Sequence, residues 1–406
     1  MILYIINQYA YNPEIGDGSK YYYLAKEFVN MGHEVYLVSA SYSHHVHSSI
    51  NQKKDVSIKF INGINHVYLK TLKYKKTTSF KRVINWLLFS YKLTNLYKFI
   101  KAKPDIIIVS SPPPIIFLGA YKLAKKLKVK LFFEIRDFWP LSLIELGNFS
   151  IWNPFIKMMQ LVEGFALERS DAIISSIPYA IDYEGFKKKY KPKYYFLPNG
   201  FDPNELITRT KIPYNISTLI PKRKFIVGYI GSCGTANALD IFLRTVEFFK
   251  NDNSISFIIV GRGEGLDNLK NEAKNKSLKN IIMINHVQKK YTQSIIQLFD
   301  VCYIGWKNKP LYNLGVSPQK LPEYLISGKP IIHSYSGKGC VVKEANAGIS
   351  IQAEDHIKIK DAILQLKNMT RIQRNQLGMN GKKYAQKYYN YKKIAKNFEK
   401  FIRSKI

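Results

Sequence analysis

Acidic residues are scarce in this chain of 406 residues: 62 Lys and Arg stand against 29 Asp and Glu, a formal net charge of +33. Cysteine is scarce too, and three residues without a CxxC spacing exclude a disulfide framework and a cysteine-rich zinc site. A reducing compartment fits this usage. A membrane-spanning helix needs about 20 apolar residues, and no such run occurs, since prolines 112–114 interrupt the apolar stretch 106–121. The start, MILYIINQYAYNP, lacks the features of a signal peptide and favours a strand and a loop.

The chain has enough apolar side chains for packed cores. A hydrophobic content of 46% with 14% aromatics excludes a disordered or collagen-like protein. Strand and helix patterns alternate twice along the sequence, and the turn-rich segment LPNGFDPNE near residue 200 separates the two series. Strands are predicted at 1–6, 33–38, 105–109, 129–135, 171–175, 225–230, 255–260, 281–284, 301–304 and 330–333, and helices at 21–32, 115–127 and 239–250.

These apolar runs are continuous rather than alternating, which is typical of parallel strands buried on both faces. The sequence therefore predicts an α/β protein with two doubly wound domains, over residues 1–200 and 201–381. Residues 382–406 are rich in lysine and tyrosine and have helical spacing. We expect this C-terminal helix to cross back onto the first domain.

One long stretch has no acidic residue. Between Asp55 and Asp105 the chain carries eleven Lys and Arg and no Asp or Glu. The segment SFKRVINWLLFSYKLTNLYKFIKAK within it predicts a helix whose apolar positions are Phe80, Ile84, Leu87 and Tyr91. A basic amphipathic helix is typical of anionic lipid surfaces, and a helix packed on its own domain with solvated lysines is the alternative. Nucleic acid is a third partner for so basic a chain, ranked last because no recognition motif accompanies the charge.

Glycine-rich loops follow several predicted strands. The first, Gly16-Asp17-Gly18-Ser19, lies between a strand and a helix, where open parallel sheets bind ligands. Tyr22 replaces the third glycine of a dinucleotide fingerprint and the second strand ends without a carboxylate, which disfavours a nicotinamide site. A glycine turn that only reverses the chain is the alternative.

The second series of strands has two such loops. They are Gly231-Ser232-Cys233-Gly234 and Gly261-Arg262-Gly263-Glu264-Gly265, and we expect them to line one phosphate-binding cleft. Arg262 could add a bidentate cation there or be an exposed loop arginine.

The segment LGVSPQKLPEYLISGKP, residues 314–330, is the most informative. Ser317 and Pro318 predict the start of a helix. The amide groups of Gly315, Val316 and Ser317 with the Lys320 ammonium are predicted to neutralise a diphosphate without a metal ion. The Glu323 carboxylate is predicted to accept ribose hydroxyls, and an i, i+3 ion pair between Lys320 and Glu323 is the alternative.

An acidic motif follows a buried strand of the first domain, in the segment Glu134-Ile135-Arg136-Asp137-Phe138-Trp139-Pro140. Asp137 lies at the carboxyl end of that strand and is the candidate for handling a hydroxyl proton. An aspartate that caps the following turn is the alternative.

Together these motifs resemble a known family. The segments YAYNPEIGDGSKYYYLAKEFVNMGHEVYLVSA, EIRDFWP, LPNGFDP, GYIGSCG, VGRGEG and SPQKLPEYLISGKPII resemble, over nearly the whole chain, the family-four retaining glycosyltransferases of the GT-B fold. They are most similar to bacterial polysaccharide-assembly enzymes of the L-fucosamine transferase type. The resemblance implies two Rossmann-like domains facing an interdomain cleft, with the donor on the second and the acceptor on the first, and it implies no cofactor and no metal.

The resemblance also assigns residues. Gly16 and Gly18 match the family's first-domain glycine loop, Asp137 the acidic position of its DxWP-like motif, Gly231 its second-domain loop, and Lys320 and Glu323 its SPxKxxEY segment. We therefore expect catalytic roles for Asp137, Lys320 and Glu323, and an acceptor-side loop with Gly16, Gly18, Ser19 and Arg136. With the loop analysis above, the expected donor-binding residues are Gly231, Ser232, Gly234, Arg262, Gly315, Val316, Ser317, Lys320 and Glu323. The chain departs from the family at Gly315, where a first signature glutamate is usual, at Ser232 and Asn237, where many members carry Arg and Lys, and at Leu141, where close relatives carry Glu.

We therefore expect a glycosyltransferase that moves a sugar from a nucleotide-diphosphate donor, UDP-linked and of the acetamido-deoxy kind, to a lipid-linked glycan with retention of configuration. The setting expected is capsule or lipopolysaccharide O-antigen assembly in the cytoplasm, peripherally at the inner face of the cell membrane. The expected partners are the donor, the lipid-linked acceptor and an anionic membrane surface, without nucleic acid. A GT-B-fold UDP-sugar epimerase and a non-enzymatic basic protein that binds lipid or nucleic acid are the alternatives.

Overall fold

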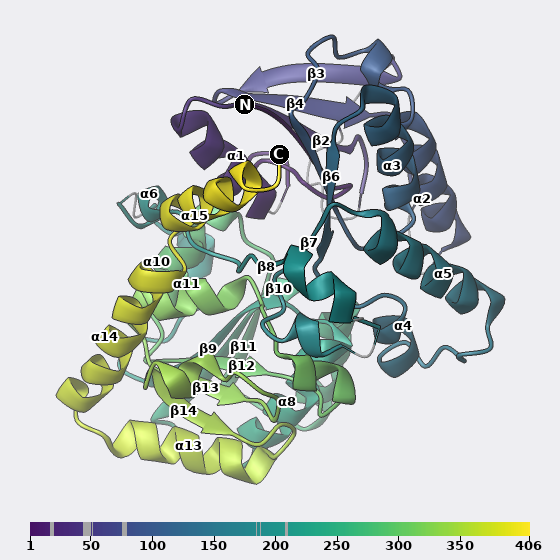
Figure 1. Cartoon of the computed structure of the whole chain (residues 1–406). Helices are drawn as coiled ribbons and strands as arrows, with labels where there is room; N and C mark the ends of the chain where they lie inside the picture. Colours follow the sequence, from purple (N-terminus) through teal and green to yellow (C-terminus); the bar gives the residue numbers. More distant parts are fainter. Residues whose placement is uncertain are drawn as a thin grey trace. The chain divides into compact units, whose positions relative to one another are not determined.

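The computed structural model describes residues 1–16, 20–43, 50, 52–74, 79–183, 185–186, 188–207 and 210–406. Gly18 and Ser19 of the first glycine loop lie outside the described residues. The chain divides into two compact units, Met1–Pro198 with Tyr391–Ile406, and Asn199–Asn390 (Figure 1). The predicted C-terminal segment 382–406 is therefore shared, because its first nine residues, 382–390, belong to the second unit.

The first unit is built on an eight-stranded sheet in the order β3-β4-β2-β1-β5-β6-β7-β8. The strands are β1 (Ile2–Ile6), β2 (Glu34–Ala40), β3 (Val56–Ile61), β4 (Ile64–Leu69), β5 (Ile106–Ser110), β6 (Lys130–Ile135), β7 (Ala172–Ser175) and β8 (Tyr194–Phe196). Only the edge pair β3 and β4 is antiparallel among these described strands. The strand order reverses between β1 and β5, and parallel sheets of this kind bind ligands outside the carboxyl ends of such a pair.

Helices cover both faces of this sheet (Figure 1). They are α1 (Lys20–Asn30), α2 (Phe80–Leu93), α3 (Ile116–Leu127), α4 (Leu141–Glu145), α5 (Pro154–Arg169) and α15 (Tyr391–Arg403), with 3₁₀ turns η1 (Leu96–Lys98), η2 (Ala180–Asp182) and η3 (Lys188–Lys193). Successive strand residues point to opposite faces. Phe132 accordingly packs against Phe401 of α15, whereas Phe133 packs against Phe117 of α3. Helices α1 and α15 thus cover one face, and α2, α3 and α5 the other.

Helix α15 completes the core of the first unit. The ring of Phe398 is buried, 6.2 Å from the ring of Phe28 on α1 and 5.4 Å from the ring of Tyr195 on β8. Tyr391 stacks on Tyr23 at 5.2 Å between ring centres. These aromatic contacts fix the helix on the unit although 194 residues (197–390) separate it from β8 in sequence.

The second unit has a six-stranded sheet in the order β11-β10-β9-β12-β13-β14, with every described pair parallel. The strands are β9 (Phe225–Ser232), β10 (Ile255–Arg262), β11 (Ile281–Asn285), β12 (Val301–Gly305), β13 (Ile331–Ser334) and β14 (Gly348–Ile351). Numbered within the unit, this is the order 3-2-1-4-5-6 of a Rossmann fold, which reverses between β9 and β12.

Two helical layers enclose this second sheet. The helices are α6 (Pro203–Ile207), α7 (Tyr214–Ser217), α8 (Leu239–Glu247), α9 (Glu264–Asn275), α10 (Thr292–Ile296), α11 (Lys320–Ser327), α12 (Val341–Glu344), α13 (His356–Asn368) and α14 (Arg371–Tyr388), and the 3₁₀ turns are η4 (Thr235–Asn237), η5 (Lys289–Tyr291) and η6 (Pro310–Leu314). Val227 of β9 packs in the cluster with α8, α9 and α13, and its neighbour Ile226 in the cluster with α10, α11, α12 and α14. Burial on both faces explains why the strands are continuously apolar.

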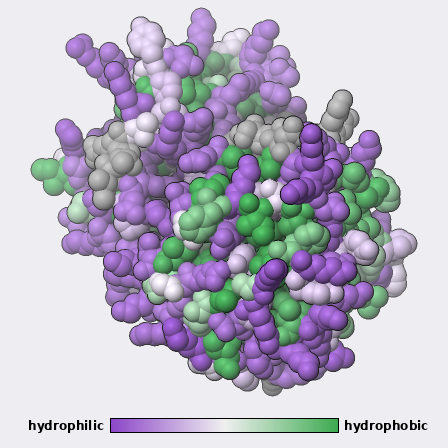
Figure 2. All heavy atoms as spheres, turned by 90° about the horizontal axis from the view of Figure 1, so that it is seen from above, coloured by the Kyte–Doolittle hydropathy of each residue, from purple (hydrophilic) through white to green (hydrophobic). Residues whose placement is uncertain are grey.

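On the face shown in Figure 2, hydrophobic side chains emerge in patches between hydrophilic ones. Within the described residues, none of the helices combines the length and apolar content needed to cross a bilayer.

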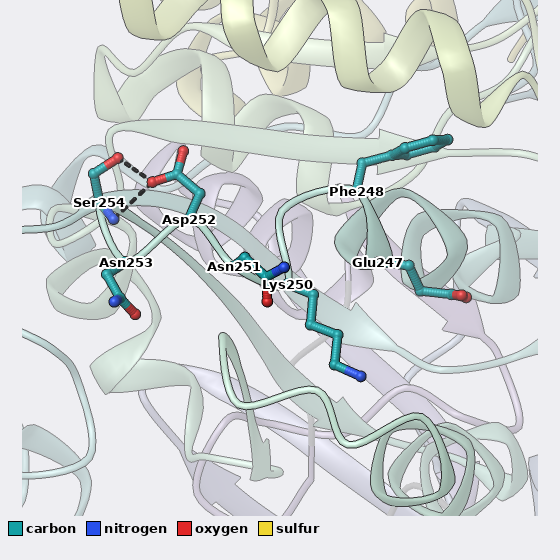
Figure 3. Close-up of a pocket in the computed structure, with 7 residues that line it drawn as sticks. All are labelled: Glu247, Phe248, Lys250, Asn251, Asp252, Asn253 and Ser254. Atoms are coloured by element: carbon teal, nitrogen blue, oxygen red, sulfur yellow. Dashed lines mark hydrogen bonds between the residues drawn. The ribbon is translucent and has the colours of Figure 1, made fainter.

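A surface pocket lies at the amino end of β10, opposite the carboxyl-end loops (Figure 3). It is lined by Glu247, Phe248, Lys250, Asn251, Asp252, Asn253 and Ser254. Asp252 accepts hydrogen bonds from the amide and the hydroxyl of Ser254, which accounts for its carboxylate as part of a turn. Since ligands of such sheets bind at the carboxyl ends of strands, the candidate site is elsewhere in the unit.

Replacement of Phe398 by alanine tests the role of α15. Because the ring is fully packed, Phe398→Ala is expected to lower the free energy of unfolding of the first unit by about 3–5 kcal/mol. Urea unfolding followed by fluorescence, with Trp86, Trp139 and Trp152 reporting on this unit, measures the change. Ile406→Ala, at a half-exposed position near the same helix, should cost less than about 0.5 kcal/mol. Equal losses in the two variants would contradict the packing argument.

Candidate active site

The carboxyl ends of β9 and β12 flank the reversal point of the second sheet, which is where ligands of such sheets bind. Gly231 and Ser232 are the last two residues of β9, and Gly305 is the last residue of β12. The sequence predicted a loop from Gly231 onwards, which was wrong by two residues. The strand continues because β10 pairs with it as far as Arg262 opposite Ser232.

Lys320 lies at this point, as the first residue of α11. Its ammonium group Nζ donates to Tyr229 Oη at 2.5 Å and to Asn237 Oδ1 at 2.7 Å. It also lies 4.1 Å from the centre of the Tyr229 ring, in a cation–π contact. Asn237 in turn donates to the Ser232 carbonyl at 3.1 Å, so strand, turn and helix hold the lysine together.

The glycines around Lys320 are required by close packing. Gly231 has φ of +153°, and a Cβ there would lie 2.8 Å from Lys320 Cε. A Cβ at Gly261 would lie 1.9 Å from the Gly231 carbonyl oxygen, and one at Gly265 would lie 2.3 Å from the Cys233 carbonyl oxygen. The two glycine clusters therefore pack against each other, and Gly231 makes room for the lysine.

The Lys320 ammonium has no anionic partner. Among the described residues no carboxylate pairs with it, and its hydrogen-bond partners Tyr229 and Asn237 are neutral. Removal from water disfavours the charged form, and this burial lowers the pKa of Lys320 to about 7. A partly buried cation without a counter-ion, at the ligand-binding end of a parallel sheet, is suited to an anion such as a phosphate group.

The segment before α11 differs from the prediction. The helix begins at Lys320, not at Ser317, and Gly315 N–H donates to the Tyr312 carbonyl at 3.0 Å. One of the three amide groups expected to face a diphosphate is thus already engaged within the chain. Asn199, which the sequence analysis did not single out, donates to the Ser317 carbonyl at 2.5 Å.

Glu323 forms no ion pair with Lys320. Its two carboxylate oxygens accept hydrogen bonds from Lys289 Nζ and Gln293 Nε2. Lys289 also lies 3.2 Å from a carboxylate oxygen of Glu205. Despite burial, these two carboxylates hold the pKa of Lys289 above its ordinary value. The alternative i, i+3 pair with Lys320 is therefore wrong, and Glu323 is a fixed carboxylate.

The remaining residues predicted to bind the donor differ in their surroundings. Arg262 is half-buried at the end of β10, and the Cys233 N–H donates to its carbonyl at 2.7 Å. A Cβ at Gly234 would meet nothing within 4 Å, so its surroundings are open. The side chain of Val316 is buried.

The first unit has a buried charged network at the carboxyl end of β6. Lys20 Nζ lies 2.6 Å from Glu134 Oε1, both side chains are fully buried, and Lys20 also donates to the Leu197 carbonyl. The other Glu134 oxygen accepts from the Tyr21 hydroxyl. Arg136 lies 5.5 Å from the Tyr21 ring centre. The sequence analysis named Arg136 but missed Lys20 and Glu134 as its neighbours.

Asp137 follows β6 and lies near a second carboxyl group. Its Oδ1 accepts from the Ser142 hydroxyl at 2.5 Å, and burial raises its pKa. Glu163 on α5, which the sequence gave no reason to select, is buried, and burial raises its pKa to about 8. A carboxyl with a raised pKa is a stronger proton acceptor once ionised. Gly16, also in this unit, is buried, and its N–H donates to the Asn12 carbonyl at 3.1 Å.

The two sheets, each reversing next to its first strand, define a pair of Rossmann-like domains. Comparison with solved structures gives the same architecture over almost the whole chain. Sucrose-phosphate synthase from Thermosynechococcus elongatus matches with a TM-score of 0.76 at 14% identity, covering 99% of this chain and 98% of that one. Trehalose-6-phosphate synthase OtsA matches with 0.75 at 11% identity, covering 99% and 98%. HepE from Anabaena, in complex with UDP-glucose, matches with 0.67 at 12% identity, covering 99% of both chains.

Family models identify both halves. Residues 21–205 match Glycosyltransferase Family 4, and residues 213–384 match Glycosyl transferases group 1. The chain is therefore a glycosyltransferase of the GT-B type, with a family 4 domain followed by a group 1 domain. The GT-B fold expected from the sequence is confirmed, and the L-fucosamine transferase type stays a prediction. No curated protein sequence matches the chain.

Substitutions at Gly231 and Gly234 provide a matched test of the close approach between Gly231 and Lys320. Gly231→Ala places a methyl group against Lys320 at a strained φ, so we expect a loss of about 1–3 kcal/mol in the free energy of unfolding. Gly234→Ala, with φ of −88° and open surroundings, should change it by less than about 0.5 kcal/mol. Fluorescence of Trp306, the single tryptophan of the second unit, follows the unfolding. Indistinguishable variants would refute the close approach.

Proposed function

We propose that this chain transfers a sugar from a UDP-linked donor to a lipid-linked glycan, with retention of anomeric configuration and without a metal ion. The observation that carries the proposal is the Lys320 ammonium, which is buried against neutral groups at the carboxyl end of β9. The diphosphate of a nucleotide sugar supplies the missing counter-charge.

The same lysine accounts for rate enhancement. When the glycosidic bond of the donor breaks, the leaving diphosphate gains negative charge. A fixed cation beside that diphosphate stabilises the transition state more than the ground state. Tyr229 and Asn237 hold the ammonium in place, so no reorganisation is needed as the charge develops.

Glu323 is proposed to bind the ribose of the donor. Lys289 and Gln293 fix its carboxylate, and each carboxylate oxygen keeps a further lone pair that can accept a hydroxyl group. The amides of Val316 and Ser317, and the side chains of Ser232 and Arg262, are proposed as further donor contacts.

Asp137 is proposed to orient the acceptor hydroxyl and to accept its proton, or to leave the proton to the departing phosphate. Ser142 holds one of its oxygens, and the raised pKa makes the carboxylate a better base. Gly16, Gly18, Ser19 and Arg136 are proposed to form the acceptor-side loop.

The choice of UDP is supported by structural neighbours. HepE from Anabaena was solved with UDP-glucose, and an E. coli trehalose-6-phosphate protein with UDP-2-fluoro glucose. An acetamido-deoxy sugar is proposed because Gly315 offers no carboxylate where the family's first signature glutamate contacts the donor. A lipid-linked acceptor at an anionic membrane surface, in capsule or O-antigen assembly, is supported by the basic, non-acidic stretch that contains α2.

Removal of the Lys320 ammonium tests the catalytic proposal. Lys320→Ala is expected to lower turnover by about 10²–10³-fold, because one fixed charge at the leaving group is lost. Radiolabelled UDP-sugars with a membrane extract as acceptor source, after treatment with EDTA, provide the assay. Lys343→Ala, at an exposed position on α12, is the control and should keep full turnover.

Two outcomes would overturn this proposal. One is near-normal turnover of Lys320→Ala, and the other is no binding heat with any UDP- or GDP-sugar in calorimetry. Incubation with UDP-sugar alone separates transfer from epimerisation, since an epimerase converts the sugar without an acceptor.

Donor binding is also expected to take up a proton. At pH 8 most Lys320 side chains are neutral in the free protein, because burial lowers the pKa of Lys320 to about 7. A bound diphosphate raises that pKa, so about 0.9 proton per donor should be taken up at pH 8 and about 0.1 at pH 6. Affinity should fall about tenfold for each unit above pH 7.

Calorimetry in two buffers of different ionisation enthalpy measures this uptake. A UDP-sugar is the appropriate probe, since both of its phosphates are esterified and stay ionised over this range. Lys320→Met removes the titrating group and should abolish the buffer dependence. Uptake that persists in Lys320→Met would assign the proton to another group.

A further inference from the structure

We propose that the outer face of α2 and α3 docks on an anionic lipid bilayer and presents the loop after β1 to an acceptor anchored in that bilayer. The inference deepens the proposed function, on which it rests, by giving the lipid-linked acceptor a place in the first unit. It adds a surface and a connection between that surface and the acceptor-side loop.

The apolar stripe of α2 points outward. Phe80, Leu87 and Tyr91 have 75%, 47% and 67% of their surfaces exposed. Together with half-buried Ile84 they occupy positions i, i+4, i+7 and i+11, one side of a helix. The helix does pack on its own unit, which was one of the two interpretations, but it packs through its other side, and this stripe faces water.

The opposite side of α2 is packed by mixed residues. Its buried positions are Asn85, Trp86, Phe89, Ser90 and Leu93. The polar members of that side have partners: Asn85 donates to the Leu72 carbonyl at 2.5 Å, and Ser90 to the Ile115 carbonyl at 3.0 Å. The exposed stripe is therefore not needed to hold the helix on the unit.

Helices α2 and α3 carry charge of one sign, and Asp55, which lies outside them, pairs with Lys92 of α2 at 2.6 Å. Residues 80–104 and 116–130, which contain α2 and α3, include Lys and Arg but no Asp or Glu. Helix α3 packs beside α2 and presents Lys122, Lys125 and Lys126 to solvent. A bilayer with anionic headgroups attracts such a surface in two ways. The exposed apolar side chains can insert among the acyl chains, and the lysines and arginines are attracted to the negative headgroups.

The aliphatic members of the stripe favour lipid over nucleic acid. Single-stranded nucleic acids bind cationic surfaces by stacking bases on aromatic rings. Leu87 and Ile84, between Phe80 and Tyr91, offer no ring for stacking but insert readily among acyl chains. The surface therefore fits an anionic bilayer.

The buried side of α2 holds the loop after β1. Asn85 Oδ1 accepts a hydrogen bond from Gln8 Nε2, and Trp86 Nε1 donates to Tyr9 Oη at 2.9 Å. The ring of Trp86 also meets the ring of Trp139 edge to face, with 5.5 Å between centres. Gln8 and Tyr9 follow β1 at the reversal point of the first sheet, and Trp139 lies two residues after Asp137.

One helix thus contacts lipid on one side and the acceptor-side segments on the other. The headgroup and first sugars of a lipid-anchored acceptor project from the bilayer surface. When α2 lies on the bilayer, the Gln8–Tyr9 loop and the Asp137 segment lie close to the headgroups. Docking therefore positions the acceptor next to these segments before the donor binds.

Vesicle sedimentation with the full chain tests the docking surface. Wild-type protein is expected to bind vesicles of phosphatidylcholine with phosphatidylglycerol at least tenfold more tightly than phosphatidylcholine alone. Leu87→Ser with Tyr91→Ser should weaken binding to the anionic vesicles by at least tenfold, through loss of apolar insertion. Lys125→Glu with Lys126→Glu should also weaken binding to the anionic vesicles by at least tenfold, because the two new carboxylates are repelled by the anionic headgroups.

Matched controls lie on the second unit. Ile372→Ser with Tyr214→Ser changes two apolar residues that are 81% and 83% exposed, and Lys274→Glu with Lys279→Glu makes the same change in net charge. Both controls should bind anionic vesicles like wild type. If the controls lose as much binding as the α2 and α3 variants, or if those variants lose none, the docking surface is refuted. The docking surface would also be refuted if the protein bound single-stranded RNA and if Leu87→Ser with Tyr91→Ser weakened that binding as much as it weakens binding to anionic vesicles.

Hydrogen exchange tests the connection to the loop. Anionic vesicles should slow amide exchange in residues 7–16 of wild type by at least threefold and leave the Leu87→Ser, Tyr91→Ser variant unchanged. Unaltered exchange in vesicle-bound wild type would refute the connection. UDP-sugar calorimetry on the same variants separates the two proposals: normal donor heat with lost vesicle binding supports both. Normal vesicle binding without donor heat would refute the proposed function and leave the docking surface standing.

Discussion

In the described part of the second unit, the Lys320 ammonium is partly buried and pairs with neutral groups rather than with a carboxylate. Burying an ammonium among neutral groups costs free energy unless a ligand supplies the opposite charge. The surrounding sequence follows from this constraint: a glycine at 231 leaves space for the side chain, and Tyr229 and Asn237 hold it in place. Asn237 is neutral, so it holds the lysine without supplying a counter-charge.

Much of the fold was predictable because its strands are buried on both faces. Runs such as those of β5 and β9 need no alternation, so hydrophobicity alone locates them. The edge strand β3 was not predicted, since it alternates apolar and polar residues and is largely exposed. Strand ends were misplaced at Gly231 because glycine suggests a loop, whereas here the neighbouring strand continues to pair with it.

The candidate site was predictable only where its residues are close in sequence. The spacing of Lys320 and Glu323 on one short helix allowed both to be predicted as site residues. The partners of Glu323 on η5 and α10 lie at least 30 residues away in sequence, so no sequence pattern connected them with the site. The orientation of α2 was likewise not predictable. Helical periodicity defines two sides, and which side is buried depends on carbonyls of other segments that accept from Asn85 and Ser90.

The return of α15 to the first unit has a consequence for biosynthesis. The aromatic surface of α1 around Tyr23 and Phe28 gains its cover only after residues 199–390 have been translated. At about 5–20 residues per second, translation of these 192 residues leaves roughly 10–40 s between the synthesis of residue 198 and the arrival of α15. During this interval the nascent first unit presents an unfinished apolar face, a natural substrate for chaperones that bind near the ribosome exit.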